Sequence, residues 1–391
     1  MISVNQALSQ IALTPVQPGE PITLPLHSAV GYTLAAEMRS PINMPPFRQS
    51  AMDGYAVNLH DSPIYTLVGE IQAGGANTVT LSPGQAVRIF TGAPVPDSAT
   101  AIVMQEHVER KENTLEVQKP IAPMDHIRPL GEQIKSGAVA LPKGTELTAA
   151  GISFLAGLGL VSVNVYPKPS VGVIVSGNEL TQPGEPLGPG QIYESNSTAL
   201  CGALHKMGIG STTLYQVRDD EAATVATISK ALDAHQVVLI SGGISVGDYD
   251  FVSKALNQLG VQQQFYKVAQ KPGKPLFYGT HKNAHVFALP GNPAAAMTCF
   301  YVYAYPLLQR ITGGCGAGMH SVTAVTSNAF NKKGPRTQFL KAHYANGSVE
   351  ILDGQASSMM HTMALANAIV VVPAELNRIE AGSSVQISLL P

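Results

Sequence analysis

Three short apolar runs between residues 170 and 290 are each followed by a glycine- or proline-rich turn and then by a helical pattern. The runs cover 171–175, 237–240 and 286–289, and helices are predicted at 196–207, 219–234, 250–259 and from 293 to about 308. Strands that alternate with helices predict a parallel sheet with right-handed crossovers. The carboxyl ends of such strands meet at one edge of the sheet, where ligands bind. This edge is therefore the first place to expect a functional site.

The segments on either side of this α/β pattern have a different composition. Residues 3–13 predict a helix capped by Ser3, and residues 146–160 predict another capped by Thr148. Between them, short alternating runs bounded by Gly/Pro turns predict a compact β domain over about 40–135, and residues 320–391 predict a second, smaller one. These changes place domain boundaries near residues 40, 136, 168 and 316.

Composition excludes several classes of protein. A hydrophobic fraction of 45% is enough to build sizeable cores and excludes intrinsic disorder. No apolar run approaches the roughly 18 residues of a spanning helix, and no Lys or Arg precedes Arg39 to begin a secretory signal. Three scattered cysteines form no disulfide framework. We therefore expect a soluble protein without a membrane span, in the reducing cytoplasm.

The formal charge of −2 conceals a strong segregation of charge along the chain. Between Phe251 and Val349 there are ten Lys or Arg and no Asp or Glu, so this stretch carries +10 and the rest carries −12. The segregation indicates a site for a strongly anionic small ligand, although a fluctuation in a charge-poor protein (13% charged residues) stays open. Nucleic acid is disfavoured, because the positive charge is diffuse and lacks interleaved aromatic residues.

Acidic residues follow the first two strands or open the next helices. Glu179 lies just past the first strand, Asp219 is predicted to start a helix, and Asp248 and Asp250 follow the Gly242-Gly243 turn. Carboxylates beside a phosphate-binding crevice commonly hold Mg²⁺. A helix cap or a solvated surface acid remains the alternative for each residue taken singly.

Lysines and glycines complete the predicted edge. Lys267, Lys271 and Lys274 alternate with apolar residues in a segment stiffened by two prolines, where they would serve an oxyanion or a phosphate as point charges. Gly242 and Gly243 would let the backbone approach a ligand closely, unless the tight turn alone requires them.

Two other patterns carry less chemistry. His281 and His285 are four residues apart, but Gly279–Asn283 is typical of a hairpin turn, so helical metal-ligand geometry does not apply. Cys299 lies on a predicted helix among apolar residues, where a buried, inert thiol is expected.

Five motifs occur in the order found in one known family. They are Ser50-Ala51-Met52-Asp53-Gly54-Tyr55-Ala56, Phe90-Thr91-Gly92-Ala93-Pro94, Ser241-Gly242-Gly243-Ile244-Ser245-Val246-Gly247, Lys271-Pro272-Gly273-Lys274-Pro275 and Leu289-Pro290-Gly291-Asn292-Pro293. On these motifs the chain resembles the molybdopterin molybdenumtransferases of the MoeA family, which includes the gephyrin E domain. The resemblance extends from Ser3 to the C-terminal β domain.

The resemblance implies a multidomain α/β plus β fold. Residues 1–40 and 137–168 would form an elongated linker domain, and residues 41–136 a β domain inserted into it. Residues 169–315 would form the α/β molybdopterin-binding domain with its parallel sheet, and residues 316–391 a C-terminal β-barrel. Family members are homodimers in which the α/β domain of one subunit faces the N-terminal β domain of the other.

The reaction that the resemblance implies is insertion of molybdate into adenylylated molybdopterin, with Mg²⁺-dependent hydrolysis that releases AMP and molybdenum cofactor. Glu179, Asp219 and Asp250 would hold the metal and, with Lys271, act in catalysis. The expected substrate-binding residues are Asp53, Thr91, Ser241, Gly242, Gly243, Gly247, Lys267, Lys274, Pro290, Asn292, Pro293 and Ser357. An upstream molybdopterin adenylyltransferase and molybdoenzyme acceptors would be protein partners.

The chain departs from the family pattern in three places. After Arg128 the family usually shows Arg-Arg-Gly-Glu-Asp, whereas this chain has Pro129-Leu130-Gly131-Glu132-Gln133, so that Gln133 replaces an acidic residue. Lys341 stands where Arg is common, and Ser358 replaces a glycine. Lysine keeps the charge but loses the bidentate fork of arginine. Reduced activity or a divergent paralogue is one consequence to test.

Two other functions compete with the transferase. A molybdopterin-binding scaffold has no need for three carboxylates beside a lysine loop. An adenylyltransferase of the related type would lack both the inserted β domain and the C-terminal barrel.

Overall fold

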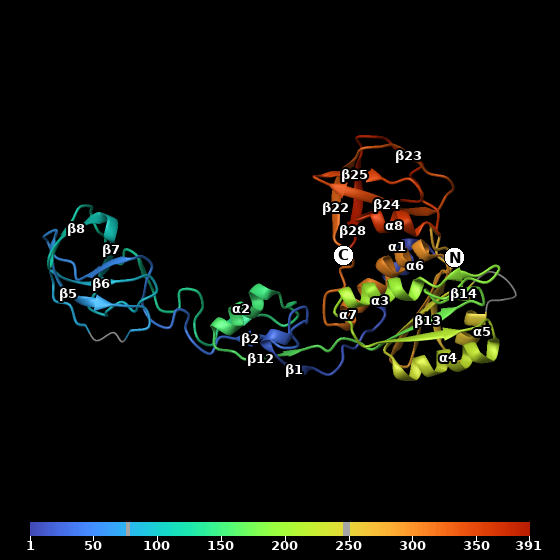
Figure 1. Cartoon of the computed structure of the whole chain (residues 1–391), viewed down its shortest axis with the longest axis horizontal. Coiled ribbons are helices and arrows are strands. Elements are labelled where there is room, and N and C mark those ends of the chain that lie inside the picture. Colours follow the sequence, from blue (N-terminus) through green and yellow to red (C-terminus); the bar gives the residue numbers. More distant parts are fainter. Residues whose placement is uncertain (76–78, 245–250) are drawn as a thin grey trace.

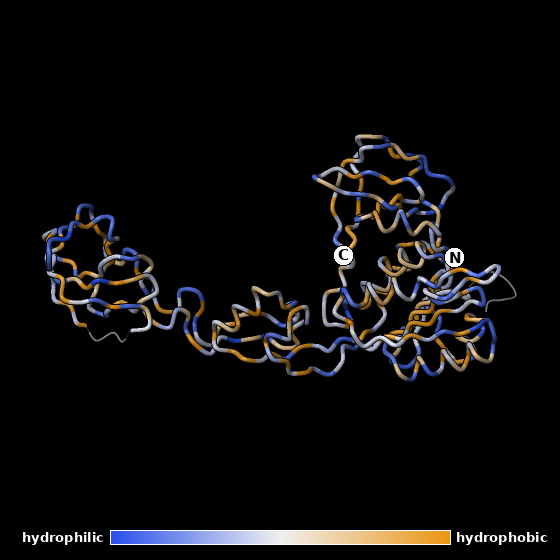
Figure 2. Tube along the Cα trace, in the orientation of Figure 1, coloured by the Kyte–Doolittle hydropathy of each residue, from blue (hydrophilic) through white to orange (hydrophobic). Residues whose placement is uncertain are grey.

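The computed structural model describes residues 1–75, 79–244 and 251–391. The molecule is elongated, with a β domain at one end, a slender middle segment, and an α/β domain with a second β domain at the other end (Figure 1). Figure 2 shows that the strands of the α/β domain are predominantly hydrophobic, whereas the outer turns are hydrophilic. The buried apolar clusters follow this division: two lie in the inserted β domain, one in the middle segment, and the others in the α/β and C-terminal domains, where one cluster includes residues of both.

The inserted β domain is built on one six-stranded sheet in the order β7-β4-β6-β5-β9-β8. Apolar residues on its two faces form two separate buried clusters, one around Val87 and Ile102 and one around Tyr65 and Leu115. The strands are β4 (Gly54–Val57), β5 (Ile64–Ile71), β6 (Gln85–Ile89), β7 (Ala101–Met104), β8 (Val108–Lys111) and β9 (Thr114–Val117). Two further short strands, β3 (Gln49–Ser50) and β10 (Ile127–Arg128), pair at the base of this domain.

The middle segment is made from two stretches of chain that are far apart in sequence. β1 (Ile22–Pro25) pairs with β12 (Ser162–Val165), and β2 (Met38–Arg39) pairs with β11 (Val139–Leu141). Helix α2 (Ala149–Gly157) covers them, and the Thr148 side chain caps it by accepting from Gly151 N at 3.1 Å. Both the predicted helix and its cap are confirmed.

The first helix lies away from this middle segment. α1 (Val4–Leu13) begins with the predicted Ser3 cap and packs Val4, Ala7 and Ile11 into the core of the α/β domain. The Arg310 guanidinium stabilises the C-terminal end of this helix by donating to Ile11 O at 2.7 Å. Residues 1–40 thus contact two parts of the molecule, and the predicted domain boundaries stay a proposal.

The α/β domain contains a six-stranded sheet in the order β16-β13-β17-β21-β20-β18. The three predicted strands, β13 (Val171–Ser176), β17 (Val237–Ser241) and β21 (Ala284–Leu289), are parallel neighbours, as expected. β16 (Thr212–Val217) extends the parallel part. The sheet is not wholly parallel, because the hairpin of β20 (Phe277–His281) with β21 and the pairing of β18 (Gln262–Tyr266) with β20 are antiparallel. The hairpin predicted at 279–283 is confirmed.

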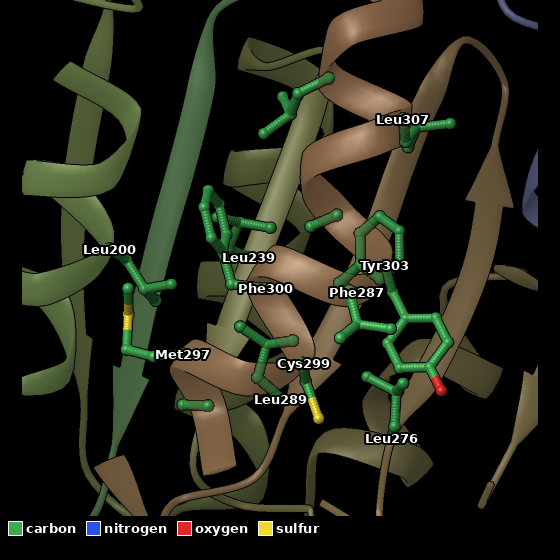
Figure 3. Packing of buried hydrophobic residues seen from close by; sticks show 14 of the residues in the cluster. Leu200, Leu239, Leu276, Phe287, Leu289, Met297, Cys299, Phe300, Tyr303 and Leu307 are labelled. Carbon is green, nitrogen blue, oxygen red and sulfur yellow. The ribbon is translucent and has the colours of Figure 1, made fainter. Parts of the chain in front are cut away.

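The helices of this domain follow the predicted pattern with small differences at their ends. They are α3 (Asn196–Lys206), α4 (Glu221–Ala234), α5 (Phe251–Gln258), α6 (Pro293–Cys299), a π-helical turn over Phe300–Ala304, and α7 (Tyr305–Ile311). The long helix predicted after residue 293 is therefore one rod with a π-helical centre. Side chains from this rod, including Phe300 and Leu307, pack on the sheet (Figure 3).

The C-terminal domain is a closed barrel of five strands. β22 (Ser321–Thr326), β28 (Ser384–Leu389), β26 (Ala368–Val372), β24 (Thr337–Ala345) and β25 (Ser348–Ile351) pair in a ring. α8 (Met360–Leu365) lies between the barrel and α6. Short strands β23 (Phe330–Asn331) and β27 (Arg378–Ile379) pair beside it. The remaining short strands are β14 (Leu180–Thr181), β15 (Ile192–Tyr193) and β19 (Gln270–Lys271).

Strand β19 joins the barrel to the α/β domain. It pairs in parallel with β24, so that Gln270 lies opposite Thr337 and Lys271 opposite Gln338. The predicted lysine loop is thereby an extension of the barrel sheet. In the described part of the chain, no helix is long and apolar enough to cross a bilayer.

Candidate functional site

A cavity of about 830 Å³ opens at the carboxyl ends of β13, β17 and β21 and reaches the barrel. Its walls come from the strand-to-helix turns, the lysine loop and one loop of the C-terminal domain. Residues that line it are Ser176, Gly177, Glu179, Leu180, Tyr193, Glu194, Ser195, Asn196, Asp219, Ser241, Gly242, Gly243, Ile244, Gln270, Lys271, Pro272, Gly273, Lys274, Pro275, Pro290, Gly291, Asn292, Pro293, Arg336, Ser357 and Ser358. Most of the residues predicted for the site from sequence are among them.

Two of the predicted carboxylates lie in this cavity. Asp219 accepts from the Ser176 hydroxyl at 2.9 Å and from the Asn178 backbone N–H at 3.2 Å, so its carboxylate is held against the end of β13. Glu179 is exposed to the cavity, and within the described part of the chain its carboxylate has no hydrogen-bond or ion-pair partner. One carboxylate is thus oriented and the other is open to a ligand.

The prediction that Asp219 starts a helix is wrong. Helix α4 is capped by Asp220, whose side chain accepts from Ala223 N at 2.7 Å. Asp219 precedes the cap and faces the opposite way, toward Ser176. Because capping occupies only one of two adjacent acids, the other is available for the cavity.

Three predicted site residues of the following turn, Gly247, Asp248 and Asp250, belong to 245–250 and lie outside the described residues. The third metal ligand, Asp250, therefore stays a prediction. Among the residues that are described, no group of three His, Cys, Asp or Glu side chains is placed to hold a metal ion.

The Gly-Gly turn brings backbone to the cavity wall. Gly242 has φ +92°, and a Cβ there would lie 2.3 Å from the Ser176 carbonyl oxygen, so only glycine fits. The Asn196 amide, at the start of α3, donates to Ser241 Oγ at 2.8 Å and to Gly291 O at 2.7 Å. It thereby joins the turns after β17 and β21.

The lysine loop supplies the positive side of the cavity. Lys271 and Lys274 are exposed and line it. Lys267, also predicted to bind ligand, is not among the lining residues, and its ammonium lies 4.5 Å from the ring centroid of Tyr266. Strand β18 ends before Lys267, whereas Lys271 lies in β19 at the contact with the barrel and Lys274 follows it.

The Pro-Gly-Asn-Pro turn meets the C-terminal domain. Asn292 donates its amide to Ser357 Oγ at 3.0 Å, and Ala295 N donates to Ser357 O at 3.1 Å. Pro290 and Pro293 line the cavity beside them. The predicted serine therefore reaches the α/β turns, although it lies 65 positions after Asn292 in the chain.

Lys341 is 4% exposed and does not line the cavity. Its ammonium donates to the carbonyls of Ala356 at 3.0 Å and Met359 at 3.2 Å, on either side of Ser357 and Ser358. Burial lowers the pKa of this lysine below its usual value. Lys341 therefore supports the serine loop from behind.

Among the polar residues of the cavity that sequence reasoning missed are Glu194, Asn196, Gln270 and Arg336. Glu194 is 2% exposed and accepts from the backbone N–H and the hydroxyl of Ser197 near the start of α3. The acid-free stretch could have drawn attention to Arg336, which is one of its ten cations. Nothing in the local pattern marks Gln270.

Two predicted residues lie far from this cavity. Asp53 and Thr91 are in the β domain at the opposite end of the molecule (Figure 1). The Asp53 carboxylate accepts from Thr91 N at 2.7 Å and from Thr91 Oγ1 at 2.8 Å. The backbone N–H of Thr91 is the main cause that lowers the pKa of this carboxyl. Gln133 is exposed near the same end and donates its N–H to Met44 O.

The cavity therefore has acids beside β13 and cations on the loops near the barrel. Carboxylate oxygens suit a hard divalent cation, and point charges on lysine suit an oxyanion or a phosphate. A ligand that spans both walls would carry phosphate and a second anionic group. This combination is typical of metal-assisted transfer at phosphorus.

Comparison with family models covers most of the chain. Residues 2–159 match the MoeA N-terminal region (domain I and II), residues 172–310 match a probable molybdopterin binding domain, and residues 323–390 match the MoeA C-terminal region (domain IV). The second match contains most of the cavity, and the third contains Arg336 and Ser357.

Individual proteins are similar over nearly their full length. The chain is 36% identical over 385 residues to "Molybdopterin molybdenumtransferase 2" of Mycobacterium tuberculosis, covering 94% of each. It is 34% identical over 398 residues to "Molybdopterin molybdenumtransferase" of Haemophilus influenzae, covering 99% of this chain and 98% of the relative. A crystal structure of the molybdopterin biosynthesis MoeA protein from Pyrococcus horikoshii OT3 matches all of both chains with a TM-score of 0.87 and 28% identity.

Proposed function

The chain belongs to the MoeA family of molybdopterin molybdenumtransferases, and from this membership we propose that its 830 Å³ cavity is where molybdenum is inserted into molybdopterin. The protein is a transferase of molybdenum cofactor biosynthesis. The observation that carries the assignment to this cavity is the gathering of Glu179, Asp219, Lys271, Lys274 and Ser357 around one space.

The substrates would be adenylylated molybdopterin and molybdate. The two dithiolene sulfurs would bind molybdenum as one oxo ligand of molybdate leaves as water with the two thiol protons, so the oxidation state of molybdenum does not change. Hydrolysis would form a bond between a water oxygen and the pterin phosphorus, break the bridging P–O bond so that AMP leaves, and release a proton to solvent. The glycines of the turns at Gly242-Gly243 and at 290–293 support this assignment, because they would let backbone approach the substrate phosphates closely.

The acidic wall fits a magnesium ion. Glu179 has an open carboxylate and Asp219 has oxygens with further lone pairs, which is the donor set that Mg²⁺ takes in phosphate chemistry. We assign the ion to these two residues together with Asp250. Bound Mg²⁺ would neutralise phosphate charge and polarise the phosphorus. Ser176 and Asn178 fix the Asp219 carboxylate in place beforehand, so little reordering is needed on binding.

The basic wall would bind the oxyanion. Lys271 and Lys274 attract molybdate and the pterin phosphate, and Arg336 adds a forked donor that suits a tetrahedral anion. Ser357, held by Asn292 from one side and by Lys341 through its neighbours, presents a hydroxyl at the same wall. Lys267 would act only through the general positive field.

The remote pair Asp53 and Thr91 would act in a second copy of the chain. In a homodimer, the β domain of one subunit would face the cavity of the other, so that both ends of the elongated molecule serve catalysis. The carboxylate of Asp53 is already oriented by Thr91, which supports a role in recognition. We further propose a cytoplasmic location, receipt of substrate from a molybdopterin adenylyltransferase, and delivery to molybdoenzymes.

The proposed function is tested by release of AMP from adenylylated molybdopterin in the presence of molybdate and Mg²⁺. We expect release to require both ions and to be abolished by Glu179→Ala, with the variant still binding the pterin. Binding without any molybdate-dependent AMP release by the wild-type protein would point to a scaffold instead. Unchanged turnover in Glu179→Ala would remove this carboxylate from the site.

A further inference from the structure

Gln270 is a fully buried amide directly behind the lysine loop, with 0% of its surface exposed. Its Nε2 donates to Gly273 O at 3.0 Å and lies 3.4 Å from Cys299 Sγ, while its Oε1 accepts from the Tyr303 hydroxyl. Every hydrogen-bonding atom of the side chain is therefore used. Buried amides that are fully satisfied rigidify the segment they belong to.

The bond to Gly273 closes the loop that carries Lys271. Gly273 has φ +82°, and a Cβ at this position would lie 2.4 Å from Cys299 Sγ and 3.0 Å from Gln270 Nε2. The loop therefore lies against the amide and the thiol with no room for a side chain. Lys271 projects from the short span between the two bonded residues, so its backbone has little freedom to move.

The backbone of Gln270 also fixes a cation from another domain. Its carbonyl accepts from Arg336 Nη1 at 3.0 Å, and β19 pairs with β24 at Gln270 and Lys271. Arg336 immediately precedes β24. One residue thus joins the loop of Lys271 and Lys274 to Arg336, although 66 positions separate Gln270 from Arg336.

The Gln270 amide carries no charge, and the two side chains that it bonds, Cys299 and Tyr303, are uncharged as well. Cys299 and Tyr303 project from the helical rod among apolar core residues (Figure 3). Burial raises the pKa of the Cys299 thiol to about 12 and that of the Tyr303 phenol well above its usual value. Both groups therefore stay protonated at any pH at which the protein works.

The absence of charge on these supporting side chains is important because the lysine side of the cavity must attract anions. Between Phe251 and Val349 no Asp or Glu is available to hold a cation in place. A carboxylate would fix the loop but cancel part of its field, since opposite charges at contact distance attenuate the attraction for a third ion. An amide and a phenol supply the same directional bonds without that cost to the field.

We propose that Gln270, together with Tyr303, is a positioning residue that sets the spacing of Lys271, Lys274 and Arg336 for an oxyanion such as molybdate. The proposal rests on the proposed function of the cavity. It adds a neutral support that is specific to the oxyanion side, and it leaves the acidic wall at Glu179 and Asp219 unaffected.

The test uses two variants of the full-length protein. Gln270→Met has a similar volume but no polar atom to hold Gly273, and Tyr303→Phe removes only the hydroxyl that orients the amide. We expect the KM for molybdate to rise about tenfold in Gln270→Met and about threefold in Tyr303→Phe. The KM for adenylylated molybdopterin should change less than about twofold.

Thr298→Val is the matched control. Thr298 is a buried residue on the same helix, and its hydroxyl donates only to Ala294 O at 2.7 Å within that helix. Its loss removes a buried hydroxyl without touching the loop, so the KM for molybdate should equal that of the wild type. Thermal unfolding of all three variants reports general damage separately from positioning.

Calorimetric titration with molybdate, without the pterin, separates this inference from the proposed function. If wild-type protein binds molybdate and Gln270→Met binds it about tenfold more weakly, the positioning role stands even when no AMP is released. Equal molybdate affinity in wild type and Gln270→Met overturns the inference while leaving the transferase function intact. Equal weakening in Thr298→Val would also overturn it, since the effect would then be general to the core.

Discussion

The inserted β domain and the α/β domain both carry predicted site residues, but they hold them in different surroundings. In the β domain, Asp53 and Thr91 bond to each other on an exposed surface. In the α/β domain, Asp219 and Ser357 are held by residues from separate segments around one cavity. A pair on an open surface cannot exclude water or surround a substrate, so the β domain supplies at most one wall of a site.

The two regions of this elongated chain therefore contribute differently to the candidate site. The α/β domain and the barrel enclose one cavity with both carboxylates and cations on its walls, whereas Asp53 and Thr91 of the β domain lie on an exposed surface. Figure 1 places the two at opposite ends of the molecule, with the middle segment between them. Substitutions made separately in each region test this difference.

The largest effect is expected at the acidic wall. Asp219→Asn should reduce molybdate-dependent AMP release about 10³-fold, because an amide binds Mg²⁺ far more weakly than a carboxylate. The neighbouring Asp220→Asn is the control, since Asn also caps helices and Asp220 bonds to Ala223 N. Equal losses in both variants would show that the acids act through the fold of α4 instead.

The next effect tests the other end of the molecule. Asp53→Ala should lower turnover about 10²-fold if its carboxylate contacts the substrate in a partner subunit. Mixing this inactive variant with inactive Asp219→Asn, after subunit exchange, should restore about a quarter of wild-type activity. About half of the dimers would then be mixed, and one of the two sites in each mixed dimer would be intact. No recovery on mixing would refute a shared site, provided that the subunits are shown to exchange.

The third prediction is that the unfolding free energy of the α/β domain falls in acid more than that of the inserted β domain. His285 is 7% exposed in β21, its Nδ1 lies 3.1 Å from the Tyr278 hydroxyl, and burial together with Arg310 lowers its pKa to about 4. A histidine whose folded pKa lies below its unfolded value stabilises the fold above about pH 6.5 and loses that contribution as pH falls toward 4. At pH 5 the α/β domain should lose about 2 kcal/mol of unfolding free energy relative to pH 7.5.

Calorimetric unfolding at several pH values checks this prediction. The transition of the α/β domain should shift with pH, and His285→Gln, which cannot be protonated, should remove most of the shift. The β domain, whose histidines at 60, 107 and 126 are not buried, provides the internal comparison. An undiminished shift in His285→Gln would assign the acid sensitivity to other groups.

The smallest effect is expected at the support of the serine loop. Lys341→Met leaves the Ala356 and Met359 carbonyls without their donor and should reduce activity about fivefold by loosening Ser357. Lys341→Arg keeps a charged donor and should recover most of the loss. A Met variant with wild-type kinetics would show that Asn292 alone holds Ser357.

Much of the α/β site could be predicted from the sequence, because its key residues follow strands. The runs at 171–175, 237–240 and 286–289 are long enough and apolar enough to be buried strands, and parallel strands must present their carboxyl ends together. The sequence therefore predicts Glu179, Ser241 and Asn292 at one edge, where all three line the cavity. The antiparallel hairpin of β20 and β21 did not disturb that edge.

The remaining site residues depend on contacts between distant segments. Asp219, Asp220 and Glu221 all suit the positive end of a helix dipole, so the sequence predicts a helix from Asp219, and only the backbone geometry shows that Asp220 is the cap. The spacing of Lys267 groups it with Lys271 and Lys274, although its ammonium lies over the Tyr266 ring. The sequence of a turn does not predict in which direction each of its side chains points.

The order of the elements, the apolar runs and the segregation of charge into an acid-free stretch all follow from the amino-acid sequence. How the ten cations of that stretch are used depends on the fold. Lys271, Lys274 and Arg336 line the cavity, whereas Lys341 is buried beneath a loop and Lys267 lies over a ring. The physical reason is that charge is a property of a residue, but its direction and its neutral supports, such as Gln270, come from packing between segments that are distant in the chain.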